Sequence, residues 1–571
     1  MPSLHALSAY ALSDAEGITF IPEALIRLAT ARTADPILFL EITARENVVT
    51  TLTDVLEDPP GTFIRPLSAL PISASYLPRT ERQTVAFLFA TRPWCGQPTD
   101  AFRAHERAIP RLISAGRISR SVPIEATVQR RGQRTIGDAT ISNPDGALDY
   151  LLTEYTLTGG SIKAWLGEPE SDSDEWALLY EATIDEVEAT RKEIRISITT
   201  IADQLERSLQ LRRYTGGGGF SGDASVSGRL RPTAWGECYG CDPVLFDASN
   251  RVYQVHDGPV QSIDAVMEGG LPYDFTADYA DYDALIDATL DTGEYATCLA
   301  LGIFRIGTTL EGLVYPIRVN LRGDARGNGY VSSTGEILYR LARNRAFLRA
   351  ESIDLAAFQG LPAGRVGYYT NGAQDVSVAS VYDALLGGVV ATYGVGRSSV
   401  LTVQRMLPAE FSLDDLTVEG EQIFDLRVEN RPFIARISQP YSYAPTFAPL
   451  DSNEISTEAD PTTANRLQVD ALTGEVFEAS DSAVPVTPQP TLITYFAEEE
   501  AAKNVARDAL LFSSRNLVPI RAELGRIGLL ADIGGIIAID NARFAADFRG
   551  VIYEQEDDLG ATVTSRVVAL G

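Results

Sequence analysis

Residues that could do chemistry concentrate in one stretch, residues 214–241, which reads YTGGGGFSGDASVSGRLRPTAWGECYGC. The glycine run at 216–219 could cradle a phosphate, but a phosphate-binding loop continues into Gly-Lys-Ser/Thr, and no lysine lies near this run. The Gly-Val-Gly-Arg segment at 394–397 lacks the third glycine of a dinucleotide-binding motif. Both patterns disfavour nucleotide binding, and we expect no cofactor.

The cysteines raise the possibility of a metal site. Cys238 and Cys241 have the spacing of half a zinc or iron–sulfur site, and a closed site needs two further ligands. Cys95 and Cys298 are each distant in sequence, while His256 lies near enough to contribute. A fold could gather these residues, but small buried thiols are the favoured interpretation. We therefore predict no metal ligands.

The sequence contains few residues that could support nucleophilic catalysis. The three histidines are His5, His105 and His256, and neither a Gly-x-Ser-x-Gly elbow nor a His-Glu-x-x-His helix accompanies them. Cys95 and His105 could form a thiol–base pair, although the Arg-Pro-Trp-Cys-Gly turn is more simply a packed corner. We predict no catalytic residue and expect that the protein is not an enzyme.

Acidic runs leave one enzymatic alternative open. The runs SDSDEW from Ser171 and DYADYDALIDATLD from Asp278 could supply the two facing carboxylates of a glycoside hydrolase. Solvated faces or loops are the more common role of such runs. Residues 322–324 spell the adhesion tripeptide Arg-Gly-Asp, but in a turn-rich stretch where Gly and Asp are expected for backbone reasons.

The overall charge favours some partners and disfavours others. The chain has 571 residues with 48 basic and 77 acidic side chains, a net charge of -29. Nucleic-acid binding rests on basic side chains that neutralise phosphates, so it is disfavoured. The same charge suits a wall past which DNA slides without sticking.

Length and residue usage define the broad class. A chain of this length with 45% hydrophobic residues suggests three to five folded domains. Four cysteines are too few for a disulfide scaffold, and the N-terminus lacks the features of a secretory signal. The sequence contains no run of about eighteen apolar residues, the length that a membrane span requires, so we predict no span. We expect a soluble protein made in a cytoplasm.

Short alternating or β-branched runs dominate the sequence and predict antiparallel strands. These runs are PILFLEITA from Pro36, TVAFLFAT from Thr84, EIRISITTI from Glu193, PIRVNLRG from Pro316 and SVLTVQRM from Ser399. Helices are predicted in four segments, namely GALDYLLTEY capped by Asp145, IADQLERSLQL from Ile201, TGEILYRLAR from Thr334 and FAEEEAAKNVARDALLF from Phe496. The pattern predicts a mainly β, multidomain fold with a few helices.

An ordered set of segments resembles the tail hub, or baseplate hub, proteins of long-tailed (siphovirus-like) bacteriophages and gene transfer agents. The similar segments include ISNPDGALDYLL, SIKAWLGE, EIRISITTIADQLERSLQ and the whole stretch at 212–266, followed by ATCLALGIFRIGTTLEGLVYPIRVNLRG. Near the C-terminus, LGRIGLLADIGGIIAIDN and RFAADFRGVIYEQEDDLGATVTSRVVA resemble the family's final sheet. The resemblance covers roughly residues 120 to 440 and 490 to 571.

The resemblance implies a domain organisation with two tail-tube-like β-barrel or sandwich domains and inserted β-rich modules. The expected parts are a β-rich N-terminal module at 1–120, a first tube-like domain at 121–213, a middle β-rich module at 214–330, a small α/β module at 331–410 and a second tube-like domain at 411–571. A Pro-, Thr-, Ser- and Asp-rich linker is expected at 444–489, with a short strand in RLQVDAL. The glycine-rich stretch is expected to be a flexible crossing between rigid bodies.

The resemblance also implies a structural role in the virion tail tip, after assembly in the host cytoplasm. Such hubs form a ring of three subunits with pseudo-sixfold symmetry, which joins the distal tail ring protein to tip or fibre proteins. Implied partners are further copies of the chain, the distal ring, tip or fibre proteins and the tape-measure protein, with DNA passing the lumen unbound during genome ejection. The alternatives are a sixfold distal tail ring protein and a β-rich carbohydrate-active enzyme acting on the host envelope.

Overall fold

The computed structural model describes most of the chain. The described residues are 27, 29, 36–46, 84–100, 102–121, 133–308, 315–327, 329–396, 399–405, 416–419, 422–428, 438–477, 490–514, 519–531, 533, 535–541, 546–560 and 563–570. His5 lies outside them, as does Arg397 of the Gly-Val-Gly-Arg segment.

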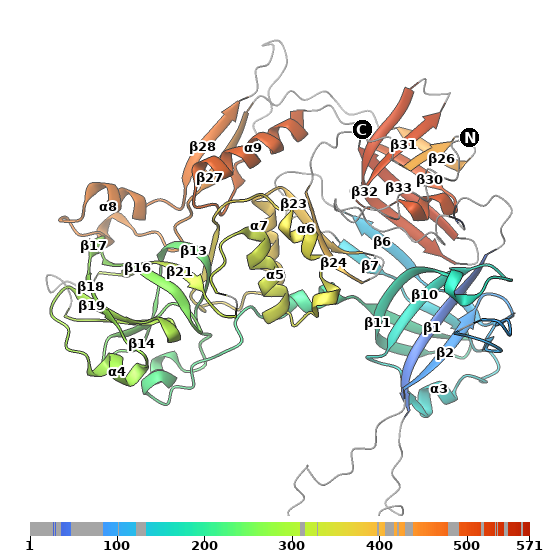
Figure 1. Cartoon of the computed structure of the whole chain (residues 1–571), viewed down its shortest axis with the longest axis horizontal. Helices are drawn as coiled ribbons and strands as arrows, with labels where there is room; N and C mark the ends of the chain where they lie inside the picture. Colours follow the sequence, from blue (N-terminus) through green and yellow to red (C-terminus); the bar gives the residue numbers. More distant parts are fainter. Residues whose placement is uncertain are drawn as a thin grey trace, which may run out of the picture.

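The fold is mainly β and multidomain with few helices, which confirms the predicted class. Predicted strands are present as β1 (Ile37–Glu46), β2 (Thr84–Ala90), β12 (Glu193–Thr199), β21 (Ile317–Asp324) and β24 (Leu401–Arg405). Figure 1 shows two curled sheets at one end of the molecule, a β-rich part at the other end and helices between them.

The first curled sheet combines strands from both sides of residue 120. Its order is β2-β1-β10-β11-β12-β8-β5, with the additional strands β5 (Leu112–Ser114), β8 (Ala139–Ser142), β10 (Ser161–Gly167) and β11 (Ala177–Ala189). Strand β1 pairs with β10 from Ile37–Gly167 to Ile42–Ile162. The expected boundary at 120 therefore passes through one sheet, because strands distant in sequence complete each other's hydrogen bonds.

This sheet curls until its two edges meet the same segment of chain. The Ile109 amide donates to the Leu88 carbonyl at 2.8 Å, and the Ala90 amide donates to the Ile109 carbonyl at 2.9 Å. Ile109 leads directly into β5, which is the opposite edge of the sheet. Closing the edges in this way satisfies backbone groups that an open sheet would expose.

The second curled sheet is formed near the C-terminus, in the order β25-β31-β32-β33-β30-β26. Its strands are β25 (Leu416–Glu419), β26 (Ile423–Val428), β30 (Pro519–Leu524), β31 (Ile536–Asn541), β32 (Ala546–Leu559) and β33 (Val563–Leu570). Its two edge strands, β25 and β26, are neighbours along the chain. The sheet is therefore also curled.

The two sheets repeat one arrangement of strands. In the first, β8 is followed by the short helix α3 (Tyr150–Thr153) and the antiparallel meander β10-β11-β12, whose last strand pairs back with β8. In the second, β30 is followed by the 3₁₀ turn η11 (Arg526–Leu530) and the meander β31-β32-β33, whose last strand pairs back with β30. The long middle strands β11 and β32 both carry a bulge against the last strand.

The middle of the chain contains two five-stranded sheets. One has the order β17-β16-β21-β13-β22, built around β13 (Thr233–Cys241), β16 (Val260–Glu268), β17 (Leu271–Pro272) and β22 (Gly367–Thr370). The other has the order β14-β15-β20-β19-β18, with β14 (Val244–Asp247), β15 (Val252–Gln254), β18 (Asp274–Asp278), β19 (Glu294–Cys298) and β20 (Ile303–Ile306). Between this part and the curled sheets lie α5 (Thr334–Asn344), α6 (Leu355–Gln359) and α7 (Val378–Gly387), with strand β23 (Ala391–Val395) paired to β24.

The predicted helices differ in how well they match the structure. Helix α5 begins where expected, because the Ser333 side chain accepts a hydrogen bond from the Glu336 amide. The segment after Asp145 is helical only in α3, whose N-cap is Asp149, and the segment from Ile201 is the 3₁₀ helix η4 (Ile201–Glu206). The predicted helix near Phe496 is present as α9 (Glu499–Ser514).

The expected linker at 444–489 contains the 3₁₀ turn η10 (Ser452–Glu454), helix α8 (Pro461–Leu467) and strand β28 (Leu472–Phe477). Strand β27 (Ser438–Tyr443) pairs with β28 (Leu472–Phe477) and β29 (Leu492–Ile493), and α9 packs against β27 and β28. The expected strand RLQVDAL is wrong, because its first residues end helix α8 (Pro461–Leu467). Leu467 packs with Met267 and Leu450, which fixes this segment to the middle sheets. Residues 478–489 lie outside the described part.

Candidate functional site

The junction between the two curled sheets is formed by one exchanged hairpin. Strands β6 (Arg117–Ser121) and β7 (Gln133–Ile136) lie between β5 and β8 of the first sheet in sequence, yet β6 pairs with β32 of the second. The Ala115 amide donates to the Leu559 carbonyl at 2.9 Å, and the Leu559 amide donates to the Gly116 carbonyl at 3.1 Å. The backbone ladder thus continues from one sheet into the other.

One hydrophobic core runs through both sheets and the hairpin. Ile118 on β6 and Ile141 on β8 belong to the same cluster of buried side chains as Ile537 and Val567 of the second sheet. Burial of apolar area stabilises by roughly 25 cal/mol per Å². A shared core of this kind holds the two repeated units as a single body and fixes their relative orientation.

A buried polar cluster lies within this junction. Arg120 on β6 is 5% exposed, and its Nη2 donates to Gln555 Oε1 at 2.7 Å and faces Asp557 Oδ2 at 3.5 Å. Asp557 is fully buried and also accepts from Ser565 Oγ at 2.6 Å and Gln555 Nε2 at 3.1 Å. A buried charge is costly unless it is paired, so this cluster selects one register between β6 and β32.

This cluster was not predicted from the sequence. Arg120 lies in the run GRISRSV, whose alternating pattern is typical of any half-exposed strand. A signal was present in the second sheet, because Gln555 and Asp557 occupy alternate positions of a strand that buries one face. Two polar side chains on the buried face of a strand indicate a partner group from elsewhere in the chain.

A second buried network brings together residues that the sequence had singled out separately. His256 is fully buried, with Nδ1 accepting from the Ala234 amide at 3.0 Å and Nε2 bonded to Asp324 Oδ1 at 3.1 Å. Asp324 is the acid of the Arg-Gly-Asp tripeptide and is 1% exposed. It also accepts from Arg340 of α5 at 3.1 Å. Asp324 therefore anchors a helix to a sheet and is not presented at the surface, whereas Arg322 of the tripeptide is exposed.

The neighbouring Asp257 extends this network. Arg345, at the C-terminal end of α5, donates to both carboxylate oxygens of Asp257 at 2.9 and 3.2 Å, and Arg326 donates at 2.7 Å. Burial acts to raise the pKa of Asp257, but His256 and Arg345 bring it well below the ordinary value. Burial lowers the pKa of His256 despite its bond to Asp324, so the ring is neutral at neutral pH.

The glycine-rich stretch is part of a packed surface. The Thr215 and Gly216 amides donate to the Ser221 carbonyl at 3.1 and 3.2 Å, and the Gly218 amide donates to the Gly222 carbonyl at 2.9 Å. Arg231 stacks over the rings of Tyr214 and Phe220. The expected flexible crossing is therefore a hydrogen-bonded loop, in which positive φ angles at four glycines allow the tight turns.

The cysteines are free thiols. Cys238 and Cys241 lie on β13 and are buried, Cys298 is buried in a different cluster, and Cys95 is exposed on β3 (Trp94–Cys95) of the first curled part. Burial and the adjacent Cys238 raise the pKa of the Cys241 thiol well above its ordinary value. In the described residues, no group of three or more His, Cys, Asp and Glu side chains is arranged to hold a metal ion.

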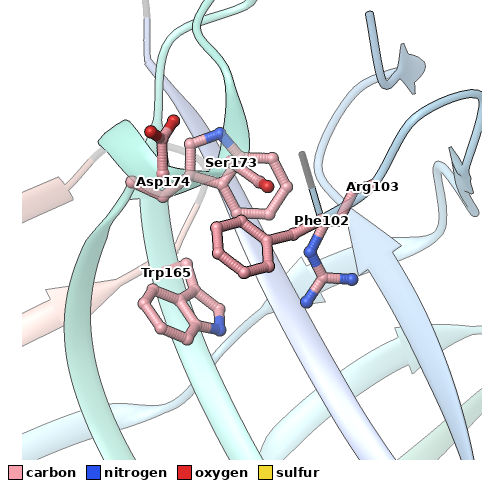
Figure 2. A pocket seen from close by; sticks show the side chains of 6 residues that line it. Phe102, Arg103, Trp165, Ser173 and Asp174 are labelled. Atoms are coloured by element: carbon pink, nitrogen blue, oxygen red, sulfur yellow. The ribbon is translucent and has the colours of Figure 1, made fainter. Parts of the chain in front are cut away.

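The remaining sequence candidates lie in two separate parts of the chain, the part around the first curled sheet and the segment around α4 (Tyr282–Asp287). His105 is exposed and has a positive φ of 61° in the turn after Phe102, and Cys95 is nearby on β3. The acidic run from Asp278 is exposed around α4, where Asp281 caps the helix. The run SDSDEW lines a depression on the first curled sheet, shown in Figure 2.

No helix of the described part has the length and apolar character needed to cross a membrane.

The expected resemblance to phage tail proteins recurs among solved structures. The chain is similar to a tail protein from Neisseria meningitidis MC58, with 9% identity over 81% of this chain and 95% of that one and a TM-score of 0.36. It is similar to the 43 kDa tail protein of prophage MuSo2 from Shewanella oneidensis, with 9% identity, coverage of 80% and 93% and a TM-score of 0.33. A chain of a native gene transfer agent particle matches with 13% identity, coverage of 65% and 91% and a TM-score of 0.37.

These identities and TM-scores are low, so each solved structure is a similarity and not an assignment. No protein-family model matches the chain, and no curated protein matches it by sequence.

Proposed function

We propose that this chain is a structural hub of a phage-like tail, in which three copies form a ring at the tail tip. The observation that carries the proposal is the repeated strand arrangement, β8-β10-β11-β12 and β30-β31-β32-β33, present twice in one chain. Three copies with two units each supply six similar positions around one axis. Such a ring can meet a sixfold tube on one side and a threefold tip on the other.

The exchanged hairpin supports this geometry. Neighbouring units of a ring must keep a fixed angle to one another. Two units joined only by a flexible linker would not keep that angle. Pairing of β6 with β32 and the shared core hold the two units rigidly. This arrangement also favours the hub over the alternative of a sixfold distal ring protein, for which one unit per chain suffices.

The charge of the chain supports a role as a channel wall. With a net charge of -29 the ring repels a polyanion, so DNA would pass the lumen without binding. The middle sheets lie away from the curled sheets in Figure 1, with the helical part between them, and the middle sheets are available for contacts with tip, fibre or tape-measure proteins. Assembly would take place in the host cytoplasm.

The enzymatic alternative has less support in the described residues. The SDSDEW depression is lined by a single carboxylate, that of Asp174, whereas glycoside hydrolysis uses two.

The position of this chain within a tailed particle tests the hub proposal directly. Particles carrying a peptide tag on this chain, labelled with gold, should show label only at the tail tip. Label on the capsid or along the tube would overturn the proposal.

A further inference from the structure

The depression on the first curled sheet is built from aromatic side chains. It has a volume of about 340 Å³ and is lined by Phe102, Arg103, Trp165, Ser173, Asp174 and Trp176. Three of the four tryptophans of the chain gather here, because Trp94 packs edge-on against Trp176 with ring centroids 4.8 Å apart. Figure 2 shows the Phe102 ring standing between Trp165 and Ser173.

The floor of the depression is rigid. Trp176 is 5% exposed and stacks on Phe39 with centroids 3.8 Å apart, and the Arg103 guanidinium lies 5.5 Å from its ring. Asp100 holds the rim by accepting from the amides of Phe102 and Ser173 and from the Ser173 hydroxyl, at 2.8 to 2.9 Å. These hydrogen bonds lower the pKa of Asp100 to about 2 although burial opposes them. Packing thus fixes the Trp176 ring, and hydrogen bonds fix the backbone of the rim at Phe102 and Ser173, before any ligand arrives.

Two features of the depression point to a ligand. Phe102 is 79% exposed, an unusual position for a large aromatic ring beside a formed hollow. The indole nitrogens of Trp165 and Trp176 are buried and have no hydrogen-bond acceptor among the described residues. Figure 2 shows the Trp165 nitrogen turned toward the side where Phe102 and Arg103 lie. The site thus offers an exposed aromatic ring, that of Phe102, and a buried indole N–H that has no acceptor within the described part of the chain.

We propose that this depression binds a neutral sugar ring of a glycan. The face of an aromatic ring is electron-rich and attracts the polarised C–H groups on one side of a pyranose. The Trp165 N–H would donate to a ring or hydroxyl oxygen, while the Asp174 carboxylate on the rim would accept from a hydroxyl. A few polar groups around an aromatic floor are the usual composition of a small-molecule site.

The charges nearby decide against an anionic ligand. Arg103 already pairs with Glu41 and with Glu106, the latter at 2.9 Å, so its charge is neutralised. Asp174 on the rim and the net charge of -29 would repel a phosphate or a nucleotide. An uncharged sugar ring is repelled neither by Asp174 nor by the net negative charge of the chain. This inference concerns binding only, and it does not depend on the ring-forming role proposed above.

Titration of the purified full-length protein with N,N′-diacetylchitobiose, cellobiose and maltose, followed by tryptophan fluorescence, tests the proposal. At least one disaccharide should bind, and F102A and W165F should each weaken that binding by about tenfold or more. W165F removes the N–H donor and keeps an aromatic ring, although a smaller one. Phe424 on β26 is 71% exposed outside this site, so F424A is the matched control and should bind as the wild type does.

Unchanged circular dichroism of the variants would establish that they fold. Failure of the wild type to bind any of the three disaccharides would overturn the proposal. So would equal affinity of the wild type and F102A, or loss of binding in F424A. A hub located at the tail tip but without sugar affinity would leave the ring proposal intact and refute this one.

Discussion

Arg120 and Gln555 are separated by 435 positions in the sequence, yet the Arg120 side chain donates to Gln555 Oε1 at 2.7 Å inside the junction of the two curled sheets. The contact fixes how strand β6 registers against β32. It also places a buried cation beside the fully buried Asp557. The geometry of this junction is the feature on which the proposed ring depends.

Loss of the Arg120 charge should destabilise the junction strongly. R120M removes the buried cation that faces Asp557, and the loss of one member of a buried ion pair costs about 3–5 kcal/mol. Arg117, on the same strand, pairs with Glu556 and Asp558 but is 60% exposed. R117M should therefore cost less than about 1 kcal/mol. Urea unfolding followed by circular dichroism measures both, and equal losses would contradict a structural role for the Arg120 cluster.

Acid should weaken the contact between the middle sheets and α5. Burial lowers the pKa of His256 in the folded chain, so the unfolded chain binds this proton at higher pH. The contribution of His256 to the free energy of unfolding is fully present above the ordinary histidine pKa of about 6.5, and it decreases as the pH drops below that value. H256Q removes the titrating ring and should reduce the loss of unfolding free energy between about pH 7 and about pH 5. The exposed His105 provides the control H105Q, which should retain the wild-type loss, and the same loss in H256Q would refute the assignment.

Two glycines of the 214–241 stretch should differ sharply in their tolerance of a side chain. Both Gly218 and Gly236 have positive φ, 82° and 68°, so both pay a similar backbone strain of about 1 kcal/mol on substitution. A Cβ at Gly236 would lie 1.9 Å from the Val366 carbonyl oxygen, whereas a Cβ at Gly218 would meet nothing within 4 Å. G236A should thus lower the thermal midpoint far more than G218A. A similar midpoint for the two variants would show that β13 does not approach Val366 this closely.

The thiols should separate into one reactive and three protected groups. Cys95 is exposed, while Cys238, Cys241 and Cys298 are buried, and burial raises the thiol pKa of Cys241 and Cys298. A thiol-specific reagent should modify one cysteine in the folded protein and four after unfolding. C95S should abolish the fast reaction. Rapid reaction of a second thiol in the folded wild type would contradict the packing of β13 or β19.

The sequence allowed local elements to be predicted where one strong signal acted alone. Helix α5 followed from Ser333 and the apolar spacing after it, and β1 followed from its β-branched and aromatic run. Helix α8 was missed although Asp460 and Pro461 form a typical N-cap and first position. The loop-rich composition around them favoured a linker, whereas packing of Leu467 against Met267 decided the structure.

Long-range pairing could not be predicted from one sequence. The exchange of β6 into the second sheet depends on partners more than 400 positions away, and nothing local distinguishes β6 from a strand of the first sheet. The His256 network could not be predicted for the same reason. His256 and the Arg-Gly-Asp tripeptide were each recognised, but only the fold brings His256 and Asp324 within 3.1 Å.

In the proposed ring, each chain supplies two neighbouring positions out of six. An electron-microscopy reconstruction of the tail tip without imposed symmetry is the decisive experiment, because it gives both the number of chains and the number of curled-sheet units in the ring. We expect three copies of the 61.8 kDa chain, each filling two adjacent densities, one for each curled sheet, joined by the β6–β7 hairpin. Six copies that each place one curled-sheet unit in the ring, or a tip without threefold symmetry, would contradict the proposed ring.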